Sequence, residues 1–417
     1  MSHADLFLAK LERARVAAQS LATVTTAQKN AGLEAIARAL ESSVPEIVAE
    51  NAKDLALGAQ NDIGEGLLDR LRLDEARLRG LAEAVRAVIA LPDPVGEVLR
   101  GSTLANGIKI NQVRVPFGVV GAIYEARPNV TIDIAALALK SGNGAVLRGG
   151  TAAENSNRVL VALIQRALHS VGLNGEAVQT IDEFGREGAS RLMRARGYID
   201  VLIPRGSAGL ISTVVQESTV PVIETGSGVV HVFVDASADE EMAVGIITNA
   251  KTHRPSVCNA AETLLVHRDA AERMLPRLAR ALQDGGVELS GDEAARAAAE
   301  GIAPATEETW STEHLALAMG VRIVASLDEA LDHIARYSTK HTEAIVTQDY
   351  ANSERFLAEV DSAVVMVNAS TRFTDGGEFG FGAEVGISTQ KLHARGPMGL
   401  SELTSTKWLV RGGGQIR

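Results

Sequence analysis

The chain has 417 residues, of which 46% are hydrophobic and 22% charged, and its formal net charge is −11. This length and composition predict a globular protein with an ample core and two or more domains. The acidic balance argues against nucleic acid as a partner, because a phosphate backbone requires a basic surface. No apolar run approaches the ~20 residues of a membrane span. No secretory signal is recognised at the start either, so we expect a cytoplasmic location and no membrane association.

Residues 4–90 carry apolar side chains at spacings of three and four, which predicts a series of helices that cover one face of a sheet. From 107 to 115 apolar and polar residues largely alternate after an Asn106-Gly107 turn signal, which is typical of an edge hairpin. An exposed edge of this kind needs a cover, and a partner subunit would serve. The tail, residues 406–411, is predicted to be a strand that pairs with this ribbon of another subunit.

Strands and helices then alternate, which predicts parallel sheets with helices on both sides. The first series of expected strands covers 118–123, 144–150, 178–181, 199–204 and 220–225. A second α/β unit begins past Val230, with strands expected at 231–235, 263–266, 322–324, 343–347 and 363–368. The glycine-rich segment 373–386 is predicted to be a mobile loop over a cleft.

Three of the expected strand ends carry glycine and polar residues: Arg148-Gly149-Gly150, Arg205 to Gly209, and Thr225 to Gly228. Glycine lets a backbone approach a ligand closely, and a following helix start offers N–H groups to an anion. The three clusters together are consistent with a dinucleotide site, although neither a G-x-G-x-x-G motif nor a P-loop occurs. Each cluster taken singly is more often an ordinary turn.

Cys258 is the single cysteine, so no intramolecular disulfide can form, and no Cys/His spacing typical of a metal site occurs. It follows Lys251, His253 and Arg254, and nearby positive charge lowers the pKa of a thiol toward its reactive form. Pro255 disfavours helix before it, and a buried strand is expected after it. From spacing alone, a nucleophile on a loop and a small buried hydrophobic residue both remain open.

Long segments of the sequence carry a family resemblance. They are Tyr124 to Asp133, Val146 to Gly150, Val220 to Gly226, Asn249 to Asn259, and Gly386 to Leu400. Over nearly its full length the chain resembles the gamma-glutamyl phosphate reductase family of the aldehyde dehydrogenase superfamily. The resemblance implies an aldehyde-dehydrogenase-like α/β fold of two Rossmann-like domains with a small β oligomerisation flap. The expected limits are 1–105 and 118–229 for the cofactor-binding domain, 230–365 for the catalytic domain, 106–117 and 384–417 for the flap, and 366–383 for a return segment.

The resemblance also implies an activity, the NADPH-dependent reduction of L-glutamyl 5-phosphate to L-glutamate 5-semialdehyde with release of phosphate, in proline biosynthesis. Cys258 matches the family nucleophile, and Asn129 resembles the asparagine that helps to form an oxyanion hole. Glu224 lies where many aldehyde oxidisers carry a water-activating base, although a structural carboxylate fits the position as well. The residues expected to bind cofactor are Pro128, Arg148, Gly206, Ser207, Thr225, Gly226 and Glu313. The candidates for substrate binding are His253, Arg254, Arg372, Lys391 and Arg395.

Under this hypothesis the thiolate attacks the acyl carbon, phosphate leaves, and the thioester is reduced to the aldehyde. Lys251 is a further candidate for tuning the thiol or binding phosphate. No acidic residue follows Arg148 in Gly149-Gly150-Thr151, which favours NADPH over NADH. A coenzyme-A-acylating or non-phosphorylating aldehyde dehydrogenase and a non-catalytic scaffold are the alternatives. Expected partners are a second copy of the chain, as dimer or tetramer, and a glutamate 5-kinase.

Overall fold

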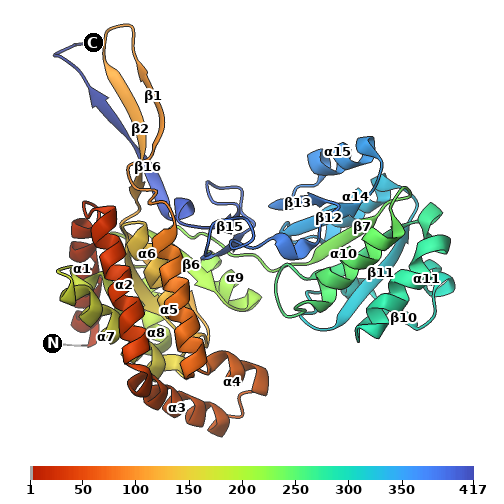
Figure 1. Cartoon of the computed structure of the whole chain (residues 1–417), viewed down its shortest axis with the longest axis horizontal. Helices are drawn as coiled ribbons and strands as arrows, with labels where there is room; N and C mark the ends of the chain where they lie inside the picture. The colour runs from red at the N-terminus through yellow and green to blue at the C-terminus, as the bar shows by residue number, and fades with distance from the viewer. Residues whose placement is uncertain (1–2) are drawn as a thin grey trace. The chain divides into compact units, whose positions relative to one another are not determined.

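The computed structural model describes residues 3–417, and the chain divides into two compact units (Figure 1). Unit 1 comprises Met1–Glu224, Gly380–Gly386 and Met398–Arg417, and unit 2 comprises Thr225–Phe379 and Ile387–Pro397. The first boundary therefore falls after Glu224, a little before the expected position at 229. Both units combine helices with parallel sheets, so the α/β class is confirmed.

The central sheet of unit 1 is parallel, in the order β5-β4-β3-β6. Its strands are β3 (Val119–Tyr124), β4 (Gly144–Arg148), β5 (Val178–Thr180) and β6 (Val201–Arg205). The segment 220–225, expected to be a strand, forms only a bridge between Val222 and Leu202. Pro221 lacks the N–H that a ladder requires, and it contributes its carbonyl alone, to the N–H of Leu202 at 2.8 Å.

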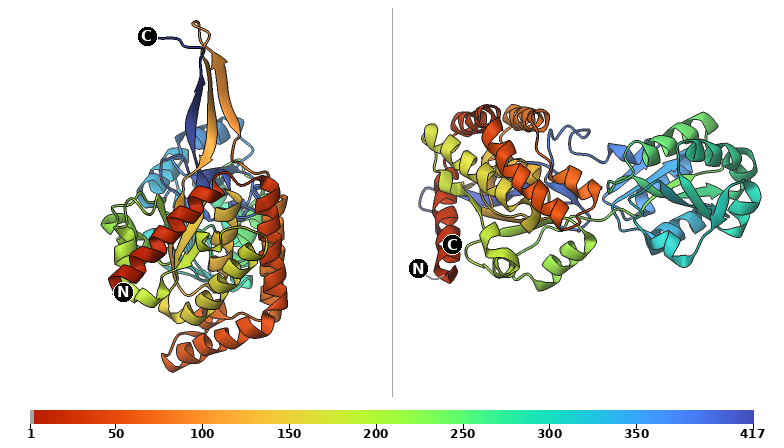
Figure 2. Two further views of the ribbon diagram at one scale, coloured as in Figure 1. Left: turned by 90° about the vertical axis from the view of Figure 1, so that its left-hand side faces the viewer. Right: turned by 90° about the horizontal axis from the view of Figure 1, so that it is seen from below.

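Helices pack around this sheet (Figure 2). They are α1 (His3–Leu21), α2 (Thr26–Ser42), α3 (Val44–Gln60), α4 (Glu65–Leu71), α5 (Glu75–Ala90), α6 (Pro128–Lys140), α7 (Glu154–Ser170), α8 (Gly185–Met193) and α9 (Ala208–Glu217). The predicted helical block thus becomes α1 to α5, with local signals at its boundaries. Thr25 and Gln28 form a capping box before α2, and a proline occupies the first turn of α3.

A separate antiparallel sheet in unit 1 joins β1 (Val98–Thr103), β2 (Lys109–Pro116) and β16 (Thr404–Arg411), with β2 in the middle. It extends away from the helices of unit 1 (Figures 1 and 2). The predicted edge hairpin is present, with Gly107 in its turn at φ +83°. The predicted partner was wrong, because the tail pairs with β2 of its own chain, Thr404 opposite Pro116 and Arg411 opposite Lys109.

The sheet of unit 2 is parallel throughout, in the order β10-β9-β11-β8-β7-β12-β13. Its strands are β7 (Val230–Val234), β8 (Ala261–His267), β9 (Glu288–Gly291), β10 (Ile302–Pro304), β11 (Ala318–Val324), β12 (Thr342–Val346) and β13 (Val364–Val367). Two of these strands, β9 and β10, were not predicted from the sequence, because they are short and contain glycine or proline. A small ribbon of β14 (Gly386–Ser388) and β15 (Gly396–Met398) follows.

Two apolar cores hold the helices of unit 2 to its sheet. The helices are α10 (Glu240–Thr252), α11 (Arg268–Asp284), α12 (Glu293–Ala298), α13 (Glu307–Ser311), α14 (Leu327–Tyr337) and α15 (Tyr350–Glu359). On β7, Val232 and Val234 pack into the core under α10 and α11, whereas Phe233 packs into the core under α14 and α15. Within residues 3–417 no helix is long and apolar enough to cross a membrane.

Candidate active site

Cys258 lies on the loop between α10 and β8 in unit 2, and its side chain is partly exposed. The predicted loop and the buried strand after it are both confirmed, since β8 is buried from Ala261 to Val266. Because β8 is parallel to its neighbours, the loop lies at the edge formed by the amino ends of the strands. The sulfur is therefore not sealed in the core, so the alternative of a buried hydrophobic cysteine is not favoured.

The residue after the cysteine anchors this loop. The Asn259 side-chain amide donates a hydrogen bond to the carbonyl of Thr374 at 2.8 Å, and the backbone carbonyl of Asn259 accepts one from the Thr371 hydroxyl at 2.7 Å. Asn259 is buried, as are both threonines. The segment after β13 is thereby fixed against the thiol loop, which brings Arg372 to the same edge of unit 2.

Gly228 lies directly against the backbone of Cys258. A Cβ at this position would overlap the Cys258 carbonyl oxygen and would stand 3.1 Å from its Cα. The Glu313 carboxylate accepts the N–H of Gly228 at 2.7 Å, and burial raises the pKa of Glu313 above its ordinary value. A glycine predicted as part of a cofactor turn is thus also a close neighbour of the thiol.

Three basic side chains gather beside the thiol loop. The Arg372 guanidinium donates through Nε to Nδ1 of His253 at 3.3 Å. Burial lowers the pKa of Arg372, and the charge of Arg254 adds to this effect, whereas Asp375 and Cys258 oppose it. In the described residues, 3–417, neither arginine is within salt-bridge distance of a carboxylate. We call His253, Arg254 and Arg372 the cation cluster.

The remaining basic candidates are engaged elsewhere. Lys251 is fully buried, with its Nζ 2.6 Å from Oε2 of Glu262, so it is not available to a ligand. Lys391 and Arg395 both pair with Asp361, at 2.6 and 2.9 Å. The structure therefore separates the cation cluster from the other basic residues that the sequence suggested.

In unit 1, the expected cofactor residues meet at the carboxyl ends of the central strands. Arg148 ends β4, Pro128 and Asn129 begin α6 after β3, and Gly206 and Ser207 follow β6. Ser207 caps α9, and both its N–H and its hydroxyl donate to Glu125, at 3.0 and 2.9 Å. This role of Glu125 was not predicted, because its only signal is its place in a long matching segment.

Two observations at this edge fit a bound dinucleotide. A Cβ at Gly206 would come within 2.8 Å of Glu125 Oε2, so glycine leaves the backbone open there without displacing the Glu125 side chain. The Nε of Arg148 is buried, and no hydrogen-bond partner for it exists in the described part of the chain. Such an atom needs a partner, and the phosphate or hydroxyl groups of a nucleotide supply one.

The buried carboxyl group of Asp182 holds the backbone just after Arg148. Asp182 accepts hydrogen bonds from the Gly149 N–H at 2.7 Å and from the Asn157 amide at 2.8 Å. Burial raises its pKa to about 7, against the opposing effect of these bonds and of Arg148. Asp182 was not predicted from the sequence, because it lies after a short strand with no glycine signal.

Asn129 is at the second position of α6, and its amide donates to Asp133 at 3.3 Å. Burial raises the pKa of Asp133 to about 6. Asn129 belongs to unit 1 and Cys258 to unit 2, so the expected pairing of the two in an oxyanion hole stays a prediction. Glu224 and Thr225 lie where the chain passes from unit 1 into unit 2, and the N–H of Gly226 donates to Ile387 at 2.9 Å.

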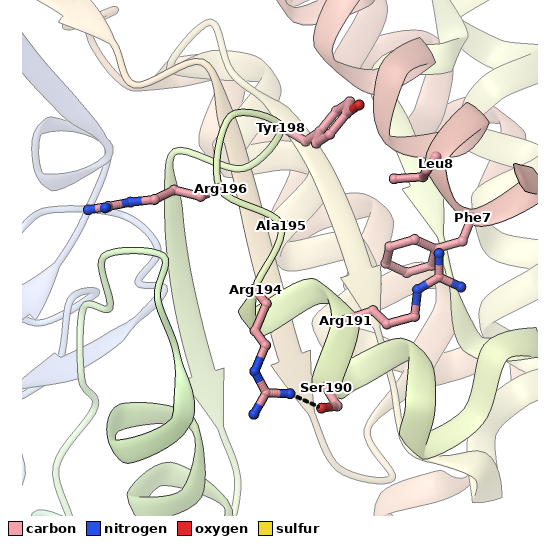
Figure 3. A pocket seen from close by; sticks show the side chains of 8 residues that line it. All are labelled: Phe7, Leu8, Ser190, Arg191, Arg194, Ala195, Arg196 and Tyr198. Atoms are coloured by element: carbon pink, nitrogen blue, oxygen red, sulfur yellow. Dashed lines mark hydrogen bonds between the residues drawn. The ribbon is translucent and has the colours of Figure 1, made fainter. Parts of the chain in front are cut away.

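A cavity of about 260 Å³ lies elsewhere in unit 1, between α1 and the segment before β6 (Figure 3). Its arginines do not converge on a common point. Arg191 stacks on Phe7 at 4.1 Å from the ring centroid, Arg194 turns to Ser190, and Arg196 points away. The cavity lies on the amino side of β6, at the edge opposite Arg148, so it is not part of the candidate site.

The comparisons with known proteins match this geometry. The model of the aldehyde dehydrogenase family matches residues 3–299. A curated gamma-glutamyl phosphate reductase of Clavibacter michiganensis is 65% identical over 98% of this chain and 94% of its own length. One from Leifsonia xyli is 64% identical over 98% of this chain and 97% of its own length.

Solved structures agree. The gamma-glutamyl phosphate reductase of Thermotoga maritima has a TM-score of 0.97 and 46% identity, and the match covers 99% of each chain. An acetylating aldehyde dehydrogenase from Geobacillus thermoglucosidasius, with a TM-score of 0.71, 17% identity, and coverage of 99% and 98%, shows the shared fold alone. The family uses a nicotinamide cofactor, in keeping with the open edge at Arg148 and Gly206. The chain therefore belongs to the aldehyde dehydrogenase family, within the group whose curated members are named gamma-glutamyl phosphate reductases.

Proposed function

We propose that this protein reduces L-glutamyl 5-phosphate to L-glutamate 5-semialdehyde with release of phosphate, the second step from glutamate toward proline. The name of relatives up to 65% identical over nearly the whole chain supports the reaction. The observation that carries it is the arrangement in unit 2, where a partly exposed thiol stands beside arginines that lack carboxylate partners. For its reduction, an acyl phosphate requires a nucleophile that attacks its acyl carbon and positively charged groups that bind the departing phosphate.

The cation cluster favours the thiolate form of Cys258, because positive charge lowers a thiol pKa. The thiolate attacks the acyl carbon, and the tetrahedral oxyanion is stabilised by Asn129 and a backbone N–H, with each such donor worth about 3 kcal/mol. The bond to phosphate then breaks, and the phosphate leaves toward Arg254 and Arg372, where it takes up a proton from water to become the hydrogen phosphate dianion. Bound NADPH supplies the hydride that reduces the resulting thioester. Collapse of the thiohemiacetal returns the thiolate and releases the aldehyde.

The choice of NADPH is part of this proposal. A dehydrogenase that prefers NADH usually places an acidic residue at the adenosine ribose, where it would repel a 2′-phosphate. Here Arg148 is followed by Gly149, Gly150 and Thr151, and its Nε has no partner in the described residues. We expect NADP⁺ to give a KM at least about tenfold below that for NAD⁺, which corresponds to about 1.4 kcal/mol, close to the lower end of the about 1.5–3 kcal/mol of a hydrogen bond to a charged group.

The reverse reaction provides the decisive assay. Glutamate 5-semialdehyde and NADP⁺ should react at a rate that saturates with inorganic phosphate, and coenzyme A should not replace phosphate. Cys258→Ala should still bind NADPH but show no turnover. Activity that requires coenzyme A, or that proceeds by hydrolysis without phosphate, would instead favour the alternative dehydrogenase chemistries.

The role of the cation cluster can be tested separately. Arg372→Ala should raise the KM for phosphate by about tenfold or more, because a charged hydrogen bond to phosphate is worth about 1.5–3 kcal/mol. Lys391→Ala is the matched control, since its partner is Asp361 and it should leave that KM unchanged. If the two substitutions changed the KM for phosphate equally, the cation cluster would not be the phosphate-binding site.

We also propose that the sheet of β1, β2 and β16 binds a second copy of this chain. Its two outer strands have unpaired edges, and Val98, Trp408 and Val410 are exposed at 54%, 47% and 62%. A long apolar edge strand invites pairing with another chain. Trp408→Glu should shift the mass measured by light scattering toward the monomer. An unchanged mass would place the interface elsewhere.

A further inference from the structure

We propose that the buried ion pair of Lys251 and Glu262 is a positioning device that fixes the backbone of the Cys258 loop for acyl transfer. The role of Cys258 as the nucleophile rests on the proposed function, but the main test measures only the reactivity of its thiol. Lys251 is in the last turn of α10 and Glu262 is the second residue of β8, so the pair closes the base of the loop. Their charged atoms are 2.6 Å apart, and the side chains are 0% and 1% exposed.

Stability alone does not account for this pair. Removing two charges from water costs as much as their attraction returns, and apolar residues of similar size often stabilise a core at least as well. Burial lowers the pKa of Lys251 and raises that of Glu262 to about 7, which is the signature of this cost. The pair instead provides a fixed geometry. Its two charged groups set the distance between the end of α10, where the thiol loop begins, and the start of β8, where that loop ends.

Glu262 is also linked to the backbone of Cys258 through a second segment, which contains Glu313 and Leu315. Its other oxygen accepts the N–H of Leu315 at 3.3 Å. Leu315 has φ +52°, a left-handed conformation that leucine rarely adopts without support from its surroundings. Near it in the same segment, Glu313 holds the N–H of Gly228 at 2.7 Å, and Gly228 lies against the Cys258 carbonyl. A continuous path of contacts thus runs from the base of the loop to the backbone of the nucleophile.

The position of this backbone matters because the tetrahedral oxyanion is to be bound by an N–H of the same loop. A misplacement of about 1 Å can cost on the order of a hundredfold in rate. Charged and titratable groups surround the loop, and the pKa of one of them, His314, is lowered by burial and by Lys251. They are His253, Arg254, Arg372, Glu313 and His314, together with Asp375 and Glu378, whose charges act on Arg372. Movement of the loop would therefore change the electrostatic surroundings of the thiol as well as its place.

The experiment replaces Glu262 by glutamine, which keeps its shape and removes its charge. The matched control is Asp93→Asn, which breaks a similar buried pair in unit 1, where Lys29 and Asp93 are 2.9 Å apart and 2% and 9% exposed. Both variants are compared by urea unfolding, by kcat and KM, and by the rate of alkylation with iodoacetamide across a range of pH. Alkylation reports on Cys258 alone, because the chain has no other cysteine.

We expect Glu262→Gln to lose about tenfold to a hundredfold in kcat, with KM little changed, and to show a shifted pH profile of alkylation. Asp93→Asn should lose stability without either change. The inference is overturned if folded Glu262→Gln keeps the alkylation profile and kcat of the parent, or if Asp93→Asn shows the same losses.

Should Glu262→Gln not fold, the double variant Lys251→Met/Glu262→Met leaves no unpaired charge and carries the same expectation. A double variant that reacts like the parent refutes the proposal. Failure of the phosphate-dependent assay would refute the proposed function and leave the alkylation result valid, so the two failures are distinguishable.

Discussion

The contact of Gly228 with Cys258 predicts that a single methyl group will disable the thiol. In Gly228→Ala the new Cβ would lie 2.5 Å from the Cys258 carbonyl carbon, whereas real Cβ contacts are essentially never under 3.0 Å. An ordinary contact between carbon atoms is about 3.5–4.0 Å, so the two backbones must separate by about 1 Å or more. Since the obstacle is backbone rather than the end of a flexible side chain, the cysteine loop itself has to move.

A displacement of about 1 Å costs on the order of a hundredfold in rate, or about 2.7 kcal/mol of transition-state stabilisation. We therefore expect Gly228→Ala to bind NADPH but to lose about a hundredfold in kcat for phosphate-dependent oxidation. The rate of Cys258 alkylation should change as well, which separates an effect on the thiol from one on the substrate.

The control is Gly245→Ala in the middle of α10, where an added Cβ meets nothing within 4 Å. This helix substitution should stabilise the protein by about 0.5–1 kcal/mol and leave kcat unchanged. The reasoning is refuted if Gly228→Ala is folded by circular dichroism and turns over within about twofold of Gly245→Ala.

Three further predictions concern other parts of the molecule. The pKa of Asp182 is raised in the fold to about 7 from a usual 3.8, so its contribution to stability is present at low pH and is lost as pH rises from about 4 to 7. Asp182→Asn should therefore remove up to about 4 kcal/mol of the pH dependence of the free energy of unfolding measured in urea. An unchanged dependence of that free energy on pH would contradict this prediction. Gly206→Ala should weaken NADPH binding measured by fluorescence without changing alkylation of Cys258; equal affinity would show that the space beside Glu125 is not used. Phe356 on α15 is fully buried, so Phe356→Ala should cost about 3–5 kcal/mol in urea unfolding, and a loss below about 1 kcal/mol would mean that this core collapses around the cavity.

Local patterns in the sequence were sufficient to predict most of the fold. Continuous apolar runs gave the strands around Val120 and Val232, and the three- and four-residue spacing gave α1 to α5. The errors share a physical cause, which is that short or proline-containing segments take their structure from their neighbours. Residues 220–225 look like a strand by composition, but Pro221 prevents a ladder. The short strand β9 forms beside β11, and β10 forms beside β9.

The candidate site could be predicted in part. Cys258 follows from its chemistry and from the matching segments, but spacing could not choose among Lys251, His253 and Arg254. That choice depends on Glu262, which lies eleven positions after Lys251 and buries its charge. Likewise, nothing in the sequence marks Asp182 as the support of the Gly149 turn, because that contact joins the ends of two different strands.

The pairing of β16 with β2 has a consequence for synthesis of the chain. Arg114 and Thr404, which are joined by a hydrogen bond, lie 290 positions apart, so β16 is synthesised long after its partner strand β2. Until then the growing polypeptide carries a hairpin with one unsatisfied edge, a state prone to aggregation. We expect nascent chains that stall before residue 404 to depend on chaperones, and a protein truncated there to be recovered largely in inclusion bodies.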